Sequence, residues 1–240
     1  MKEEADRIVL ITGGRTGIGR SLAEAFLRRG ATVIVTSRGF ESNRSLQAAE
    51  SEFPDARGAY IPARLEVREE ASAAALFEDI DRKFGRLDVL VNNAGRGIFK
   101  PFGEFALEEW REILDVNLTG AFLCSRLALA LMEKNGGRII NMGSVAGKFA
   151  LPDNSVYGAS KFGLRGLSLI LSAEYAPRGI GVTLISAGAV RGAFWGERPG
   201  FDAGRMLAPE DLARVILDVA LTPLGVRIDE IDVTPPEGIL

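Results

Sequence analysis

Short apolar runs rich in β-branched residues alternate along this chain with longer amphipathic stretches. The first run, residues 7–12, shows no polar alternation, which is typical of a parallel strand covered on both faces. A helical pattern follows over residues 17–29, and a second apolar run over residues 32–36. Repeated strand–helix–strand units of this kind predict an α/β fold, a doubly wound parallel sheet with helices on both faces.

The same alternation continues through the rest of the sequence. Further strands are predicted at residues 59–65, 87–91, 138–141, 181–186 and 230–233, and further helices at residues 41–52, 69–84, 107–134, 155–176 and 209–221. There is no repeat or linker, so we expect a single domain over residues 1–240. The glycine- and proline-rich segment at residues 188–208 is too long for an ordinary connection, which predicts a substrate lid loop.

Charge and hydropathy argue against nucleic-acid and membrane partners. The formal net charge is -3, whereas nucleic-acid binding needs a basic patch. The first residues are charged, and no uninterrupted apolar stretch approaches the roughly 18 residues of a membrane span. We therefore expect a cytoplasmic protein without a signal peptide.

The chain contains no histidine, which removes Ser-His-Asp and Cys-His chemistry and most catalytic zinc sites. The single cysteine, Cys124, lies in an apolar helical run and is expected to be a buried structural thiol. We predict no metal site. Proton transfer near neutral pH must then come from a tyrosine, a lysine or a carboxylate whose pKa is perturbed.

A glycine-rich turn joins the first predicted strand to the first predicted helix. Glycines there let the backbone approach a pyrophosphate, whose charge lies at the helix N-terminus. The turn therefore predicts a Rossmann-type dinucleotide site, although by itself it also fits a plain turn before a helix. The candidate cofactor contacts are Gly13, Arg15, Thr16, Gly17, Ile18 and Gly19.

The end of the second strand indicates which dinucleotide is bound. An acidic residue there selects NAD(H), and an arginine accommodates the 2′-phosphate of NADP(H). The sequence reads Ser37-Arg38, with no carboxylate before Glu41, and Arg15 can face the same phosphate. We predict NADP(H) in preference to NAD(H); the alternative is that Arg38 is a solvated surface residue.

Tyr157 and Lys161 are four residues apart in a predicted helix, so they share one face of it. A nearby ammonium favours the phenolate and is expected to lower the pKa of Tyr157. Ser144, thirteen residues before Tyr157, could hold the carbonyl or hydroxyl oxygen with which the tyrosine exchanges a proton.

In their order and spacing these motifs resemble the short-chain dehydrogenase/reductase family, in its shorter single-domain branch, over nearly the whole chain. They are Thr-Gly-x-x-x-Gly-Ile-Gly at 12–19, Asn-Asn-Ala-Gly at 92–95, Asn117, Ser144 and Tyr-x-x-x-Lys at 157–161. The resemblance implies an oxidoreductase that transfers hydride between NADP(H) and a small carbonyl or alcohol substrate. It also implies a homodimer or homotetramer that pairs through the helices near residues 107–134 and 155–176.

The resemblance further implies the site residues. Asn117, Ser144, Tyr157 and Lys161 look like the catalytic tetrad. Tyr157 would be the general acid or base, and Ser144 would polarise the substrate oxygen. Lys161 would also hold the nicotinamide ribose, and Asn117 would anchor a water. The remaining implied cofactor contacts are Asn93, Ala94, Gly95, Gly188 and Val190.

Three departures from the family pattern stand out. Arg64 falls where many relatives have an adenine-binding aspartate, with Glu66 as its possible substitute. The segment at residues 187–192 lacks the usual proline and threonine, since Ala187 and Gly192 stand there, which predicts a looser loop and weaker cofactor binding. The C-terminal segment Ile-Asp-Val-Thr-Pro-Pro marks a subgroup.

No motif names a substrate. Phe194 and Trp195, with Arg191 and Arg198 nearby, could cover an apolar substrate or could pack on the core. Further candidates for pocket walls are Gly97, Ile98, Phe99 and Leu151. The departures leave a second hypothesis open, a non-catalytic NAD(P)-binding sensor or regulator on the same fold.

Overall fold

A single parallel sheet organises the computed structural model, which describes residues 6–43, 45–49, 53, 55–195 and 202–239. Its seven strands follow the order β3-β2-β1-β4-β5-β6-β7, and every neighbouring pair is parallel. The doubly wound fold predicted from the alternating pattern is confirmed. The strands are β1 (Ile8–Ile11), β2 (Thr32–Ser37), β3 (Tyr60–Arg64), β4 (Val89–Asn92), β5 (Gly137–Met142), β6 (Ile180–Ala187) and β7 (Glu230–Val233).

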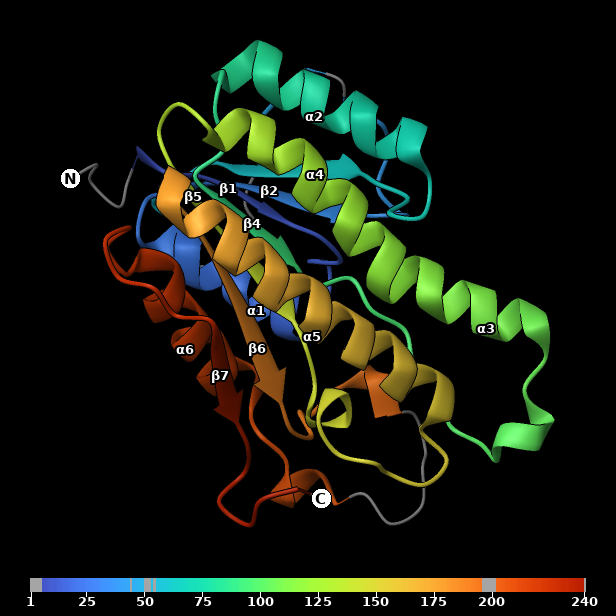
Figure 1. Cartoon of the computed structure of the whole chain (residues 1–240). Helices are drawn as coiled ribbons and strands as arrows, with labels where there is room; N and C mark the ends of the chain where they lie inside the picture. The colour runs from blue at the N-terminus through green and yellow to red at the C-terminus, as the bar shows by residue number, and fades with distance from the viewer. Residues whose placement is uncertain (1–5, 44, 50–52, 54, 196–201, 240) are drawn as a thin grey trace.

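Helices cover both faces of the sheet (Figure 1). Helices α1 and α6 pack together on one face, and α2, α4 and α5 lie on the other. The α-helices are α1 (Gly17–Arg28), α2 (Glu70–Phe84), α3 (Leu107–Leu114), α4 (Gly120–Met132), α5 (Ser155–Tyr175) and α6 (Pro209–Leu221). Short 3-10 turns span Phe102–Glu104, Val145–Gly147, Ala176–Arg178, Ala193–Trp195 and Ala203–Arg205.

The strand sequences are apolar throughout because both faces of the sheet are buried. In β1, Val9 and Ile11 belong to the core beneath α1 and α6, whereas Ile8 and Leu10 belong to the core beneath α2 and α4. Successive side chains of a strand point to opposite faces, so each strand supplies both cores.

The helix predicted over residues 107–134 is continuous but not uniform. A π-helical turn at Asp115–Thr119 separates α3 from α4 and contains the buried Asn117. Single π turns inside α-helices are frequent at functional sites.

The span Leu107–Met132 is long and apolar enough, by length and composition, to cross a membrane. The expectation concerned uninterrupted apolar stretches, and this span is interrupted by charged residues such as Asp115 and Arg126. In the structure, however, 50% of its most apolar window is buried inside the protein. It lies mid-chain and packs on α2 and the sheet, as the core helix of a soluble protein does.

The helix predicted at residues 41–52 is wrong over the residues described there, 41–43 and 45–49, which contain no helix. Asn43 explains the difference, because its amide donates to the carbonyls of Gln47 and Pro62 and accepts from the Gln47 N–H. Such local side-chain bonds compete with helical ones. Leu46 also has a positive φ of 47°, which a right-handed helix excludes.

The strand order reverses beside β1, since β2 and β3 lie on one side of it and β4 to β7 on the other. In open parallel sheets, ligands bind outside the carboxyl ends of the strands at such a switch point. The ends of β1 and β4 therefore mark where a site is expected.

Candidate active site

A cleft of about 890 Å³ opens at this edge of the sheet. It brings together most of the residues singled out from the sequence. Those that line it are Gly13, Arg15, Thr16, Gly17, Ile18, Ser37, Arg38, Asn93, Ala94, Gly95, Ser144, Tyr157, Lys161, Gly188 and Val190. Two others, Gly19 and Asn117, are buried behind its wall.

The glycine-rich turn and the end of β4 are tied to each other. Gly13 has a φ of 64°, and a Cβ there would lie 2.9 Å from the Ala94 Cα, so only glycine fits. The Asn93 amide donates to the carbonyls of Thr12 and Gly13 at 2.9 and 3.0 Å. Gly19 packs on the same amide, where a Cβ would come within 2.6 Å of its nitrogen. Asn93 and Gly19 therefore shape the turn.

The N-terminus of α1 faces the cleft without a side-chain cap on its first amides, since Thr16 makes no capping hydrogen bond. Thr16, Gly17 and Ile18 all line the cleft. Amide donors and the positive end of a helix dipole suit a pyrophosphate. This donor set fits the dinucleotide that the sequence predicts.

Arg15, Ser37 and Arg38 meet at one end of the cleft. The Arg15 guanidinium lies 5.8 Å from the centre of the Phe40 ring, and a Cβ on Gly39 would be 2.8 Å from its Nη1. The Gly39 N–H donates to Ser37 Oγ at 3.2 Å. The Arg38 side chain is 62% exposed, so its guanidinium is accessible to a ligand. Two cations and a hydroxyl at one place have the chemistry that suits an anion.

Glu66 lines the same end of the cleft, next to Leu65 and Val67. It receives two hydrogen bonds from Arg68, at 2.9 and 2.8 Å, and lies 3.9 Å from Arg38. The Arg68 hydrogen bonds, helped by the charge of Arg38, lower the pKa of Glu66. The expectation that Arg64 occupies this position is wrong, because Arg64 is exposed and lines a separate hollow with Ser42.

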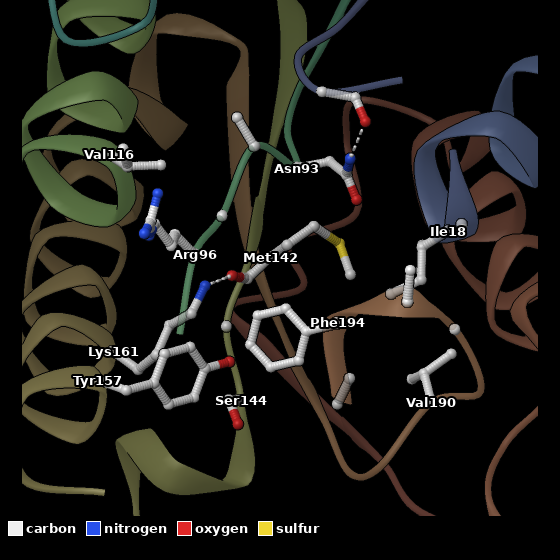
Figure 2. Close-up of a pocket in the computed structure, with 18 of the residues that line it drawn as sticks. Ile18, Asn93, Arg96, Val116, Met142, Ser144, Tyr157, Lys161, Val190 and Phe194 are labelled. Carbon is white, nitrogen blue, oxygen red and sulfur yellow. Dashed lines mark hydrogen bonds between the residues drawn. The ribbon is translucent and has the colours of Figure 1, made fainter. Parts of the chain in front are cut away.

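At the other end, α5 carries Tyr157 in its first turn and Lys161 one turn later, and Ser144 follows β5 (Figure 2). The Tyr157 hydroxyl lies near Ser144, whose Oγ accepts a hydrogen bond from the Ala146 N–H at 3.1 Å (Figure 2). Lys161 Nζ donates to the Met142 carbonyl at 2.6 Å and lies 5.6 Å from the Tyr157 ring centre. The three side chains share one water-poor corner.

Burial is the largest cause of the pKa shifts of Tyr157 and Lys161. It raises the pKa of Tyr157 to about 12, against a smaller lowering by the Ser144 hydrogen bond, and lowers the pKa of Lys161 to about 8. The expectation that Lys161 lowers the pKa of Tyr157 is therefore wrong for this structure. The phenolate would be desolvated here, and the ammonium is directed to the Met142 carbonyl instead of the phenol oxygen.

Asn117 does not reach the cleft. Its amide accepts from the Arg96 N–H at 2.8 Å and donates to the Arg96 carbonyl and to Ser160 Oγ, both at 2.9 Å. It fastens the segment after β4 to α5, which carries Tyr157 and Lys161. Asn117 thus lies behind the reactive side chains and holds their supports together.

The segment after β6 closes the cleft. Its backbone is anchored on both sides, since Gly188 donates to Val233 and Leu207 to Ala189, each at 2.9 Å. Of the wall candidates, Phe99 and Leu151 line the cleft, as does Phe194. The Trp195 side chain and Arg198, for which predictions were made, lie outside the described residues.

Several lining residues escaped the sequence analysis because they flank motifs without belonging to them. Arg96 directly follows the Asn-Asn-Ala-Gly run and pairs with Glu112 at 2.7 Å. For those that follow a strand, adjacency to the strand end is the signal that could have found them; Glu112, Val116 and Asn154 lie on or beside helices and carry no such signal. The residues missed in this way are Leu65, Val67, Arg96, Glu112, Val116, Met142, Gly143, Val145, Ala146, Asn154, Ala189 and Ala193.

A glycine turn under a helix N-terminus, a cationic end and a buried tyrosine–serine–lysine corner in one cleft define a dinucleotide-dependent oxidoreductase. The family model of the short chain dehydrogenases matches residues 7–199. The chain therefore belongs to the short-chain dehydrogenase/reductase family.

Relatives of this chain act on different substrates. It is 36% identical to the D-threitol dehydrogenase of Mycolicibacterium smegmatis over 181 residues, 75% of this chain and 68% of that protein. It is 34% identical to the 3-oxoacyl-(acyl-carrier-protein) reductase FabG of Salmonella typhimurium over 220 residues, 91% of this chain and 84% of that protein. The closed form of serine dehydrogenase complexed with NADP+ has a TM-score of 0.83 and 31% identity, covering 97% of this chain and 96% of that one. The protein is thus an NAD(P)-dependent oxidoreductase for a small-molecule substrate.

Proposed function

We propose that the protein is an NADP(H)-dependent carbonyl reductase that converts a small ketone or aldehyde into its alcohol. The observation that carries this proposal is that Tyr157, Ser144 and Lys161 line one end of a cleft whose far end is cationic, with Lys161 Nζ 5.6 Å from the Tyr157 ring centre. A poised phenol beside a buried ammonium has a use in proton transfer and none in nucleotide sensing.

The preference for NADP(H) rests on the cationic end. Arg15 and Arg38 present two guanidinium groups, which bind phosphates through charge-assisted hydrogen bonds, and Ser37 adds a hydroxyl. A carboxylate that selects NAD(H) would have to face this cationic end of the cleft. The nearest one that lines the cleft, Glu66, is held by Arg68 and lies 3.9 Å from Arg38.

The residues that would hold the cofactor run along the cleft from the cationic end to Lys161. The glycine turn and the first amides of α1 would hold the pyrophosphate, and Glu66 would accept a hydrogen bond from the adenine amino group. Lys161 would contact the nicotinamide ribose, with Gly188 and Val190 closing over the ring. When bound, NADPH supplies a hydride for the carbonyl carbon.

Tyr157 acts as the general acid and donates its hydroxyl proton to the substrate oxygen, which Ser144 holds in place. Because burial raises the pKa of Tyr157 to about 12, the phenol keeps its proton at neutral pH. A protonated phenol can donate the proton that the reduction of a carbonyl requires. Lys161, with a pKa lowered to about 8, lies close enough to neutrality to return a proton from solvent to the tyrosine.

The whole chain is proposed to work as one catalytic domain with a lid in the segment at residues 188–208, of which residues 196–201 lie outside the described part of the chain. Asn117 is assigned a positioning role, because its amide hydrogen bonds join the segment after β4 to α5.

The catalytic assignment is tested with Tyr157→Phe, using Tyr175→Phe at the far end of α5 as the matched control. Tyr157→Phe should lose about 100-fold or more of turnover, the usual contribution of general acid catalysis, and keep its NADPH affinity. Tyr175→Phe should change neither. Turnover that survives in Tyr157→Phe would refute the role of the phenol.

The cofactor assignment is tested by fluorescence titration with NADPH and NADH. Arg38→Ala should weaken NADPH binding about 5- to 30-fold, the loss of one partly solvated charge-assisted contact, and leave NADH binding unchanged. Arg64→Ala removes an exposed arginine outside the cleft and serves as the control. Equal weakening of both nucleotides would overturn the 2′-phosphate assignment. Nucleotide binding without turnover of any carbonyl would instead favour the non-catalytic sensor.

A further inference from the structure

Three aromatic rings from separate segments of the chain meet at the reactive end of the cleft. The ring centres of Phe99 and Tyr157 are 5.4 Å apart, and that of Phe194 lies 5.8 Å from Phe99 and 5.7 Å from Tyr157. Both phenylalanine rings point at Gly97, where a Cβ would come within 2.7 Å of Phe194 and 2.8 Å of Phe99. We call Phe99 and Phe194 the ring clamp, and Gly97 is the floor on which they meet.

The ring clamp borders the space where the reaction would occur. Figure 2 shows the Phe194 ring beside the hydroxyl end of Tyr157. A carbonyl oxygen held by Tyr157 and Ser144 must project the two substituents of its carbon into the surrounding space. At least one substituent therefore meets Phe99 or Phe194.

The chemistry of this wall is mostly apolar. Besides the ring clamp, Val145, Leu151 and Ala193 line the cleft. Apart from the reactive side chains, the cofactor contacts and the cationic end, the polar residues among the described lining are Asn154, the exposed Arg191, and Arg96 and Glu112, which pair with each other at 2.7 Å. A polyol placed against the rings would lose hydrogen bonds to water and gain few in return.

Part of the Phe194 ring is exposed to water and is available for a ligand to cover. Its side chain is 41% exposed although it touches two other rings. A flat apolar group that covers the ring removes this surface from water and gains ring–ring contacts. A hydrophilic group of the same size gains neither.

On the basis of the function proposed above, we propose that the ring clamp determines the substrate class. One substituent of the carbonyl carbon is an apolar group, aryl or compact alkyl, that packs against Phe99 and Phe194. Phe194 is the specificity-determining residue, because it sits on the loop after β6 and contacts both Phe99 and the catalytic tyrosine. Because Gly97 has no side chain, both rings can pack over it.

The test compares two ketones of similar size, the apolar acetophenone and the hydroxylated erythrulose. Their binding to the protein loaded with NADP+ is measured by calorimetry in the Tyr157→Phe background, so that the result does not depend on turnover. Turnover of both ketones with NADPH is then measured with Tyr157 intact. The variants are Phe194→Ala, Phe194→Leu, which keeps an apolar side chain, and Phe102→Ala as a control for an exposed ring outside the cleft.

We expect acetophenone to bind more tightly than erythrulose, and Phe194→Ala to weaken acetophenone binding about tenfold with NADP+ affinity unchanged, as expected for the loss of one ring contact. Phe194→Leu should stay within about threefold and Phe102→Ala should have no effect. Preference for erythrulose, or a Phe194→Ala variant that binds acetophenone normally, overturns the clamp. Failure of the proposed function has a different signature: ketone binding depends on Phe194, yet intact protein reduces neither ketone.

Discussion

Lys161 offers a quantitative test of how dry the reactive corner is. Burial lowers its pKa from 10.5 to about 8, so between these two values the unfolded chain holds a proton that the folded protein has released. The free energy of unfolding must then rise with pH across this window. Lys161→Met removes the titrating group and should remove this rise.

The magnitude follows from the two pKa values. Between pH 7 and pH 9.5, the linkage relation gives about 2 kcal/mol of added stability for the protein with Lys161, relative to Lys161→Met. Other consequences of the substitution, such as the loss of the 2.6 Å hydrogen bond to the Met142 carbonyl, do not vary with pH. They change the free energy of unfolding by the same amount at pH 7 and at pH 9.5, so they cancel in the comparison.

The assay is urea unfolding at several pH values from 7 to 9.5, a range below the ordinary tyrosine pKa of about 10. Lys134→Met, at an exposed position after α4, is the control and should show no pH-dependent difference from the unsubstituted protein. A difference between Lys161→Met and the unsubstituted protein that stays constant within about 0.5 kcal/mol over this range would mean that Lys161 is solvated. The argument for a water-poor proton relay would then fail.

Three further predictions concern the glycine turn, the thiol and the outer surface. Gly13→Ala should weaken NADPH binding about tenfold, because the added Cβ overpacks against Ala94. Gly17→Ala should weaken it less, since Gly17 shares the positive φ but a Cβ there has nothing within 4 Å. Equal effects of the two substitutions in a fluorescence titration would contradict this. Burial raises the pKa of the Cys124 thiol to about 12, so a thiol reagent should label it only as the chain unfolds in urea, and rapid labelling of the native protein would exclude a buried thiol. Phe122 on α4 and Phe162 on α5 are 45% and 48% exposed, which predicts a homo-oligomer that Phe162→Glu dissociates in light scattering; a monomeric unsubstituted protein would count against it.

The fold was largely predictable because its strands carry a strong local signal. The apolar run in β1 contributes Val9 and Leu10 to different cores, and no other secondary structure buries both so well. The failure at residues 41–52 has the opposite origin. There the hydrogen bonds of Asn43, one of them to the distant Pro62, decide the local path, and no periodicity in the sequence reports them.

The site was predictable where it depends on residue type at a strand end or at a fixed spacing along a helix. Tyr157, Lys161 and Arg38 stand out by their chemistry and lie in the cleft as expected. Glu66 and Phe194 were candidates, and both line the cleft, but the contact of Phe194 with Phe99 and Tyr157 depends on how distant segments return to it, which spacing does not encode. The pKa of Tyr157 was mispredicted for a related reason, since desolvation is a property of the folded packing and not of the Tyr-x-x-x-Lys pattern.

The π turn at Asp115–Thr119 makes the length of this segment as important as its composition. One residue advances an α-helix by about 100° around its axis, so a single-codon deletion here would turn α3 by that angle relative to α4. Asn117 would leave its pocket, and the tie from Arg96 to Ser160 would break. Conservative exchanges at the neighbouring positions leave the angular register intact. In this stretch the genetic tolerance for replacement should therefore far exceed the tolerance for a change in length.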